Sequence, residues 1–227
     1  MKRKKKKNND SKSKMIEEEV WNKIYKSDST FFGQESSNFG LLCFNYMKAN
    51  DVRKVLELGA GHGRDTIFFT SNGIEEVEAL DYSTVAVEIL NKIAQEKKLP
   101  IKSQAFDVRK KPLPFPDGYF DVIYSHMLLN MRFSLHELHF IFSEIRRVLI
   151  KPKKGLNFFS VRNYNDKSYG KGREVDKVLY DIDGFQIRFF TEKDIQDLAV
   201  TEGFDILWIK EEYEEPVTLY LVSSRKT

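Results

Sequence analysis

The stretch from Val55 to Asp81 constrains the fold of this chain more than any other part of its sequence. It reads VLELGAGHGRDTIFFTSNGIEEVEALD, in which a short apolar run leads into glycines at alternate positions, Gly59, Gly61 and Gly63. A helical pattern follows, and then a second short apolar run that ends at Asp81. A buried strand that passes through a glycine-rich turn into a helix is how a doubly wound sheet builds a nucleoside site. Glycine lets the backbone approach a ligand where a Cβ atom would block it.

The spacing of these glycines differs from that of a dinucleotide-binding turn. The dinucleotide pattern is G-x-G-x-x-G with the pyrophosphate at the helix N-terminus, whereas here the third glycine comes one position early and Arg64 follows it. Glu57 precedes the turn and Asp65 follows it, and these acids would repel a pyrophosphate. They suit a ligand with an ammonium and a sulfonium group and no phosphate, a description that S-adenosylmethionine meets. At the next strand end, the carboxylate of Asp81 can accept both ribose hydroxyls.

The string E-x-G-x-G-x-G, followed by an acid at the next strand end, resembles motif I and the ribose-binding acid of class I S-adenosylmethionine-dependent methyltransferases. The resemblance implies S-adenosyl-L-methionine as the cofactor. It also implies that the acid after the third strand accepts from the adenine amino group. The cofactor-binding residues expected on this basis are Tyr25, Phe32, Gly33, Glu57, Gly59, Ala60, Gly61, Gly63, Asp81, Tyr82, Ser83, Phe106, Asp107, Val108 and Ser125.

Three other segments resemble narrower groups of small-molecule methyltransferases. Residues 113–131 are similar to the stretch before and across strand four in the type 11 group. Residues 21–37 resemble the segment that closes over the methyl donor in tellurite-resistance-type and thiopurine-type enzymes, where the rings of Tyr25 and Phe32 would face the sulfonium in cation–π contacts. The string DGFQIRFFTE before the last helix also points to the tellurite-resistance-type group. These resemblances imply a small-molecule acceptor.

Strand and helix patterns alternate along most of the chain. The predicted strands are Lys54–Leu58, Val77–Leu80, Ile101–Phe106, Phe120–Ser125, Gly155–Val161, Asp205–Glu211 and Val217–Ser223, and the predicted helices are Glu17–Tyr25, Ser37–Lys48, His62–Asn72, Thr84–Lys97, His136–Leu149 and one that begins at Thr191. Such alternation predicts a parallel sheet with right-handed crossovers. Residues 212–216 are too few for a crossover, so the last strand should run antiparallel. We therefore expect an α/β fold, a doubly wound, mostly parallel seven-stranded sheet, which is the Rossmann-like fold of class I methyltransferases.

Charge divides the chain into a short tail and one domain. Residues 1–14 carry a net charge of +7 and the remainder carries −4. The tail has no apolar residue after Met1 and cannot contribute to a core, so it is expected to be a disordered, solvated arm. Residues 15–227 then form a single methyltransferase domain, with an N-terminal helical lid at 15–50 and a substrate-side insertion at 162–190.

The candidate acceptor residues follow the fourth and fifth strands, since ligands bind at the carboxyl ends of strands in such sheets. His126 is the candidate catalytic residue because the pKa of imidazole lies near neutrality; a purely structural role is the alternative. The insertion is expected to cover the acceptor, or else to be a surface excursion without a role in binding. The candidate substrate-binding residues are His126, Asn130, Arg162, Asn163 and Arg188.

Composition excludes several other classes of protein. The 227 residues suffice for one domain with a substantial core, and no apolar run approaches the length of a membrane span. A single cysteine, Cys43, cannot form an internal disulfide, which favours a cytoplasmic location. No cluster of metal-ligand residues is visible, so no metal is expected. The sequence leaves the oligomeric state open.

The acceptor is the least determined part of this interpretation. A soft nucleophile such as a thiol or a chalcogen needs little help from a base, which suits the few candidate bases. One alternative is a nucleic-acid or protein methyltransferase steered by the basic tail, although residues 125–128 read SHML and not the Asn/Asp-Pro-Pro-aromatic string of base-amino methylases. The other is a protein that binds S-adenosylmethionine without catalysis.

Overall fold

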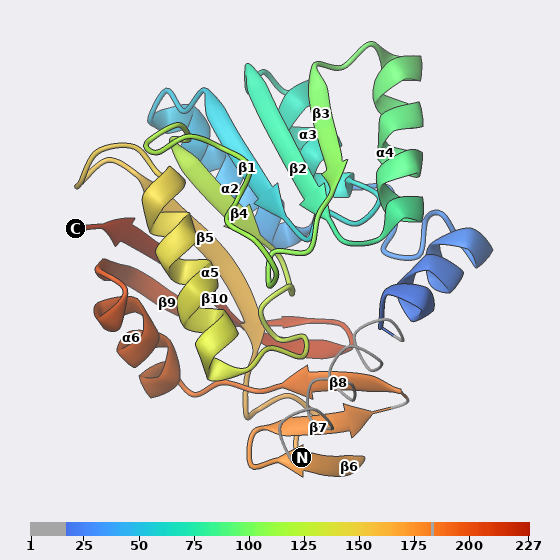
Figure 1. Ribbon diagram of the computed structural model, residues 1–227, viewed down its shortest axis with the longest axis vertical. Coiled ribbons are helices and arrows are strands. Elements are labelled where there is room, and N and C mark those ends of the chain that lie inside the picture. The colour runs from blue at the N-terminus through green and yellow to red at the C-terminus, as the bar shows by residue number, and fades with distance from the viewer. Residues whose placement is uncertain (1–16, 183) are drawn as a thin grey trace, which may run out of the picture.

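A seven-stranded sheet forms the centre of the computed structural model, which describes residues 17–182 and 184–227 (Figure 1). The strands are β1 Lys54–Leu58, β2 Glu76–Asp81, β3 Ile101–Ala105, β4 Val122–Ser125, β5 Leu156–Arg162, β9 Phe204–Glu214 and β10 Val217–Lys226. Their order is β3-β2-β1-β4-β5-β10-β9. Neighbours from β3 to β5 run parallel, and β10 runs antiparallel to both β5 and β9. The predicted seven-stranded fold with a reversed last strand is thus confirmed, and the predicted tail at 1–14 lies outside the described residues.

Helices cover both faces of this sheet (Figure 1). They are α2 Asn38–Ala49, α3 Arg64–Ser71, α4 Thr84–Lys97, α5 Leu135–Val148 and α6 Glu192–Thr201, and residues 17–27 are also helical. Apolar side chains of α2 and α3 pack on one face of β1 and β4, and those of α5 and α6 pack on the other. None of the helices within the described ranges is long and apolar enough to cross a membrane. Burial on both faces explains why the central strands read as continuous apolar runs.

The helices begin where the sequence supplies capping side chains. Ser37 and Ser83 precede α2 and α4, and each side-chain oxygen accepts from a backbone amide of the first turn. Ser134 forms a capping box with Glu137 at the start of α5. These caps satisfy amides that have no partner within a helix. Since α2 and α4 start beside the glycine-rich turn, their caps also fix the surroundings of the site.

The insertion at 162–190 contains a second, three-stranded antiparallel sheet that the sequence analysis did not predict. Its strands are β6 Arg173–Asp176, β7 Leu179–Ile182 and β8 Phe185–Arg188. A cluster of aromatic side chains that includes Tyr169 and Phe189 packs beneath it. Figure 1 shows this small sheet beyond the carboxyl ends of β1 and β4, and the N-terminal helix lies near the same edge of the main sheet.

A buried ion pair joins the start of this insertion to the main sheet. The guanidinium of Arg162 donates to both carboxylate oxygens of Asp166, at 3.0 and 2.7 Å. One of these oxygens also accepts from the backbone amide of Thr218 in β10, at 2.9 Å. Burial would raise the pKa of Asp166, but the hydrogen bonds from Arg162 and the backbone outweigh it and lower the pKa. Arg162 is therefore engaged within the protein at the point where the chain leaves β5.

Asp166→Ala is expected to lower the free energy of unfolding by about 3–5 kcal/mol, because it leaves a buried guanidinium without its partner. Urea unfolding followed by circular dichroism measures the change. Asp117→Ala is the matched control: Asp117 contacts Arg147 at 2.8 Å, but its side chain is 80% exposed, so the expected loss is below about 1 kcal/mol. Equal losses in the two variants would contradict a structural role for the Arg162–Asp166 pair.

Candidate functional site

A cavity lies at the carboxyl ends of β1, β2 and β4, and the glycine-rich turn forms one of its walls. Gly59 and Gly61 both have positive φ, at 72° and 56°. A Cβ atom at Gly61 would lie 2.5 Å from the hydroxyl oxygen of Tyr25, and one at Gly59 would lie 2.9 Å from Cδ1 of Leu128. A side chain at either position would therefore fill the space between the turn and the facing residues.

Asp81 lies at the end of β2 with its carboxylate buried beside this turn. One oxygen accepts from the amide of Gly61 and the other from the amide of Ser83, both at 2.8 Å. Burial raises the pKa of Asp81 to about 6, against the opposing effect of these two hydrogen bonds. The Ser83 hydroxyl donates to the side-chain oxygen of Asn22 at 2.6 Å. Ser83 therefore holds the N-terminal helix and α4 and does not line the cavity.

Two further carboxylates line the cavity beneath the turn, as the sequence pattern predicts. Glu57 accepts a short hydrogen bond from the Thr66 hydroxyl. Burial raises its pKa well above the usual value, and the nearby charge of Asp65 raises it further. Asp65 accepts from the amide of Ser37 at 2.7 Å and from the hydroxyls of Ser37 and Tyr124 at 2.8 and 2.7 Å. Asp65 is thus engaged by three protein donors, which leaves Glu57 and Asp81 to face a ligand.

Arg109 organises the far side of the cavity, where Tyr82, Phe106, Asp107 and Val108 lie. Its guanidinium donates to Asp107 at 2.8 and 3.0 Å and to Glu17 of the N-terminal helix at 3.0 Å. It also lies 5.5 Å from the ring centroid of Tyr82. Burial would raise the pKa of Asp107, but the hydrogen bonds and charge of Arg109 lower it. The sequence analysis missed Arg109, although it follows Asp107 by two residues. Because both oxygens of Asp107 are engaged, this carboxylate is a poorer acceptor for an adenine amino group than the resemblance implies.

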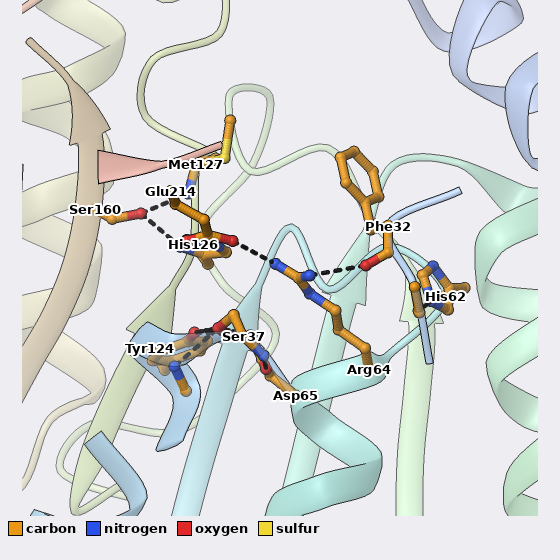
Figure 2. A network of polar contacts seen from close by, with 12 residues as sticks. Phe32, Ser37, His62, Arg64, Asp65, Tyr124, His126, Met127, Ser160 and Glu214 are labelled. Atoms are coloured by element: carbon orange, nitrogen blue, oxygen red, sulfur yellow. Dashed lines mark hydrogen bonds and ion pairs between the residues drawn. The ribbon is translucent and has the colours of Figure 1, made fainter. Parts of the chain in front are cut away.

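Residues 17–37 close the cavity from above. Trp21, Tyr25 and Phe32 line it, and the Trp21 ring centroid lies 5.9 Å from each of the other two. Arg64 donates to the carbonyl oxygen of Phe32 at 2.7 Å, and Nε2 of His62 lies 2.8 Å from that of Gly33 (Figure 2). Side chains of the glycine-rich turn and of the first residue of α3 therefore hold the covering segment in place.

His126 follows β4 and lines the cavity, and a side chain of the protein lies close to each of its two ring nitrogens (Figure 2). Nδ1 lies 2.7 Å from the hydroxyl of Ser160. The same hydroxyl oxygen accepts a hydrogen bond from the amide of Met127 at 2.9 Å. Nε2 lies 3.4 Å from a carboxylate oxygen of Glu214, whose other oxygen lies 3.4 Å from the guanidinium of Arg64. The nearby His126 ring and the charge of Arg64 lower the pKa of Glu214 despite its burial, although Nε2 of His126 makes no hydrogen bond of good geometry to it.

Glu214 was not predicted as a site residue, because the expected strand ended three residues earlier. In the structure β9 continues to Glu214 and brings its carboxylate to His126.

Met127 adopts a positive φ of 58°, a conformation that is uncommon for a residue with a side chain and is often found at functional sites. Ser125, a predicted cofactor contact, is buried within β4 and does not line the cavity.

The predicted acceptor residues separate into two groups. His126 and Asn130 line the cavity, but Arg162, Asn163 and Arg188 do not. Besides the pairing of Arg162 with Asp166, Asn163 donates to Glu211 at 2.8 Å and Arg188 donates to the carbonyl oxygen of Phe133 at 3.2 and 2.8 Å. These three side chains support the insertion and the loop after β4. Their prediction as acceptor contacts is corrected, because position after a strand end does not fix where a long side chain finds its partner.

Apolar residues that the sequence analysis did not select line the cavity, whereas Arg162, Asn163 and Arg188 do not. Phe185 and Ile187 of β8 line the cavity together with residues of the loop after β4. Their alternation with Gln186 and Arg188 is the period-two signal of a half-buried strand, so the sequence did contain a sign of their role. The other unselected residues that line the cavity are Glu17, Trp21, Phe31, His62, Arg64, Asp65, Leu80, Arg109, Met127, Leu128, Met131 and Phe133.

Residues 55–152, which include β1 to β4 and α5, match a family model described as a methyltransferase domain. These residues carry a methyltransferase domain. None of the curated protein sequences compared with this methyltransferase matches it.

Solved structures share its fold at low sequence identity. An S-adenosylmethionine-dependent methyltransferase from Methanosarcina mazei is 18% identical with a TM-score of 0.71, over 85% of this chain and 98% of that one. The Burkholderia thailandensis 1,6-didemethyltoxoflavin-N1-methyltransferase, with bound 1,6-didemethyltoxoflavin and S-adenosylhomocysteine, is 20% identical with a TM-score of 0.72, over 96% and 90% of the two chains. The [4+2]-cyclase SpnF is 15% identical with a TM-score of 0.68, over 92% and 94%. These likenesses establish the class I methyltransferase fold.

The cofactor that a methyltransferase domain implies is S-adenosylmethionine, and the cavity fits it. The glycine-rich turn brings its backbone to the cavity wall so closely that a Cβ atom at Gly61 would collide with the Tyr25 hydroxyl. The buried carboxylate of Asp81 is held rigidly beside that space by two backbone amides, in a position to accept from ribose hydroxyls. Arg64, the cation next to the turn, is engaged by Phe32 and Glu214. Among the described residues, the wall therefore offers acidic groups and no unpaired arginine, which suits a cationic nucleoside without phosphate.

Affinity for S-adenosylhomocysteine is expected to depend on pH through Asp81. Since its pKa is about 6, the hydroxyl-accepting carboxylate is present above pH 6 and is lost as the pH falls below it. Affinity should then fall by up to about tenfold per pH unit below pH 6. Isothermal titration between pH 5 and 7.5 measures this. Asp81→Asn should bind weakly at every pH, whereas Asp107→Asn should keep the pH dependence, because the pKa of Asp107 lies below this window. An unchanged profile in Asp81→Asn would refute the assignment.

Gly61→Ala is expected to weaken binding of S-adenosylhomocysteine by more than about tenfold, since the new Cβ atom meets the Tyr25 hydroxyl where the ligand approaches the backbone. Gly118→Ala is the control. Gly118 has a similar φ of 65°, but a Cβ atom there meets nothing closer than 3.9 Å. Both variants should remain folded in thermal unfolding, with the larger loss of stability in Gly61→Ala because of its contact with Tyr25, and only Gly61→Ala should lose binding in titration. Full binding by Gly61→Ala would mean that the turn does not contact the cofactor.

Proposed function

We propose that this enzyme transfers the methyl group of S-adenosylmethionine to a small-molecule acceptor bound between the loop after β4 and strand β8. One observation carries the proposal. A single cavity is lined both by the donor set at Gly61 and Asp81 and by apolar residues of the loop and β8, such as Met131 and Phe185. The Burkholderia thailandensis relative, which is named for methylation of 1,6-didemethyltoxoflavin and was solved with that compound, supports a small organic acceptor.

In this proposal the residues of the chain bind, orient and exclude water. When bound, the cofactor supplies a methyl carbon that its sulfonium already activates toward a nucleophile, so alignment and removal of water are the main tasks of the protein. Asp81 accepts from the ribose hydroxyls, and Glu57 faces the positive charge of the cofactor. Trp21 and Phe32 cover the site as a lid, and their rings can face the sulfonium.

His126 is the candidate to receive a proton from the acceptor or to orient it. Ser160 already accepts from the Met127 amide, so its hydroxyl can donate to Nδ1, and the ring proton is then on Nε2 facing Glu214. In that form the imidazole is a rigid wall of the cavity. Transfer of a proton to it requires Nδ1 to exchange its contact with Ser160 for one with the acceptor, and Glu214 would stabilise the imidazolium that results.

The acceptor class expected from the sequence gains no support from the charges of the site. Thiols and reduced chalcogen species react as anions, and an anion buried without a cationic partner is strongly disfavoured. Arg64 and Arg109 are the cavity-lining arginines within the described residues, and carboxylates pair with both. Assignment to the tellurite-resistance-type group therefore rests on the sequence resemblance alone.

Deletion of residues 1–14 is expected to leave methyl transfer to a small acceptor unchanged within about twofold, because the described residues that line the cavity all belong to the expected domain at 15–227. Transfer of labelled methyl from S-adenosylmethionine to a panel of thiols, selenols, amines, nitrogen heterocycles and RNA measures this for both chain lengths. Methylation of RNA that depends on the tail and declines steeply with salt would instead favour the nucleic-acid alternative. Binding of the cofactor with no transfer to any acceptor in the panel would favour a non-catalytic binding protein.

A further inference from the structure

The half of the cavity that would take the acceptor is apolar, in contrast to the half at the glycine-rich turn. It is formed by the loop after β4, with Met127, Met131 and Phe133, and by Phe185 and Ile187 of β8. None of these side chains carries a charge. Aromatic and sulfur-containing side chains favour flat, polarisable ligands.

The roof over this half is made by two segments that lie far apart in the sequence. The ring centroids of Trp21, from the N-terminal helix, and Phe185, from β8, are 5.3 Å apart. The backbone of β8 is in turn fixed to the loop after β4, because the amide of Arg188 donates to the carbonyl oxygen of Asn130 at 2.7 Å. The roof is therefore fixed to the loop that forms the other wall, so the shape of this half of the cavity is set by contacts within the protein.

The charged side chains that line the cavity are already engaged by the protein. Arg109 bridges Glu17 and Asp107, at 3.0 and 2.8 Å. Arg64 is taken by Glu214 and by a backbone carbonyl. An anionic acceptor would find no unpaired guanidinium among the described residues of the cavity wall, so its desolvation would go uncompensated.

Two polar atoms on this side of the cavity have no hydrogen-bond partner among the described residues: Nε2 of His126 and the side-chain oxygen of Asn130. The side-chain oxygen of Asn130 is buried and accepts no hydrogen bond from any described residue, although Asn130 lines the cavity and is only 2% exposed. Its amide nitrogen makes one weak contact, with the sulfur of Met131 at 3.8 Å. Buried amide oxygens nearly always accept a hydrogen bond, and one without a partner in a cavity marks a place where a ligand donor fits.

We propose that the acceptor is an uncharged, planar heteroaromatic molecule and that Asn130 recognises it by accepting a hydrogen bond from a ring N–H. This rests on the proposed function and names its substrate class. The aromatic and methionine side chains of the wall select the ring system, the lack of an unpaired arginine among the described residues of the wall disfavours anions, and the Asn130 oxygen selects rings that carry a donor over those that do not.

Three bicyclic probes test the proposal on the full chain saturated with S-adenosylhomocysteine. 2-Quinolone has a ring N–H, N-methyl-2-quinolone replaces that hydrogen with a methyl group, and naphthalene-2-carboxylate is a flat anion of similar size. In calorimetric titration, 2-quinolone should bind at least about fivefold more tightly than its N-methyl derivative, the preference expected from one hydrogen bond to a buried acceptor. 2-Quinolone should also bind at least about tenfold more tightly than naphthalene-2-carboxylate.

Asn130→Leu keeps the size of the side chain and removes the acceptor, so the ratio between 2-quinolone and N-methyl-2-quinolone should fall to about one. Asn45→Leu, at an exposed position of α2, is the matched control. It should leave unchanged the preference for 2-quinolone over N-methyl-2-quinolone and the preference for 2-quinolone over naphthalene-2-carboxylate. Retention of the preference in Asn130→Leu would overturn the role of Asn130. Tightest binding of the anion, or binding of S-adenosylhomocysteine with none of the three probes, would overturn the acceptor class while leaving the methyltransferase function intact. Failure to bind S-adenosylhomocysteine at all would instead refute the proposed function.

Discussion

The buried carboxylate of Asp65 is the contact on which the arrangement of the site depends. It lies in the first turn of α3, where the helix dipole favours a negative charge. It accepts from the amide and hydroxyl of Ser37, the N-cap of α2, and from the hydroxyl of Tyr124 in β4 (Figure 2). Removing it would leave buried donors on two other elements without an acceptor. One side chain thus fixes the end of the covering segment, the start of α3 and strand β4 relative to one another.

The glycine-rich turn and the residue after it have two sets of partners, one bonded to the backbone and the other to side chains. The amide of Gly61 faces Asp81 on the cofactor side. The side chains of His62 and Arg64 reach the carbonyl oxygens of Gly33 and Phe32 on the covering segment. Movement of that segment away from the cavity therefore requires two hydrogen bonds to the turn itself to break. The same short motif shapes the cofactor wall and holds the cover over it.

The fold and the cavity wall around the glycine-rich turn were predictable from the sequence because their signals are local. Buried strands give apolar runs, caps lie beside the helices that they start, and the turn and Asp81 are close along the chain. The contacts of Arg109 with Glu17 and of Glu214 with His126 were not predictable in this way, because they join residues distant in sequence. Positional reasoning also misplaced Arg162. An acid four residues later captures its guanidinium, and burial makes that local pairing stronger than any attraction to the cavity.

The contact between Trp21 and Phe185 has a consequence for how the protein is made. The two halves of the roof come from opposite ends of the chain, and the last strand that supports His126 lies later still. During synthesis the glycine-rich turn and Asp81 emerge early, but the chamber around them stays open until the final hairpin has left the ribosome. A nascent chain therefore offers only a partial surface to the cofactor. A ligand of this cavity therefore depends on contacts that only the folded chain provides, and a ligand that binds only the folded state stabilises it against unfolding.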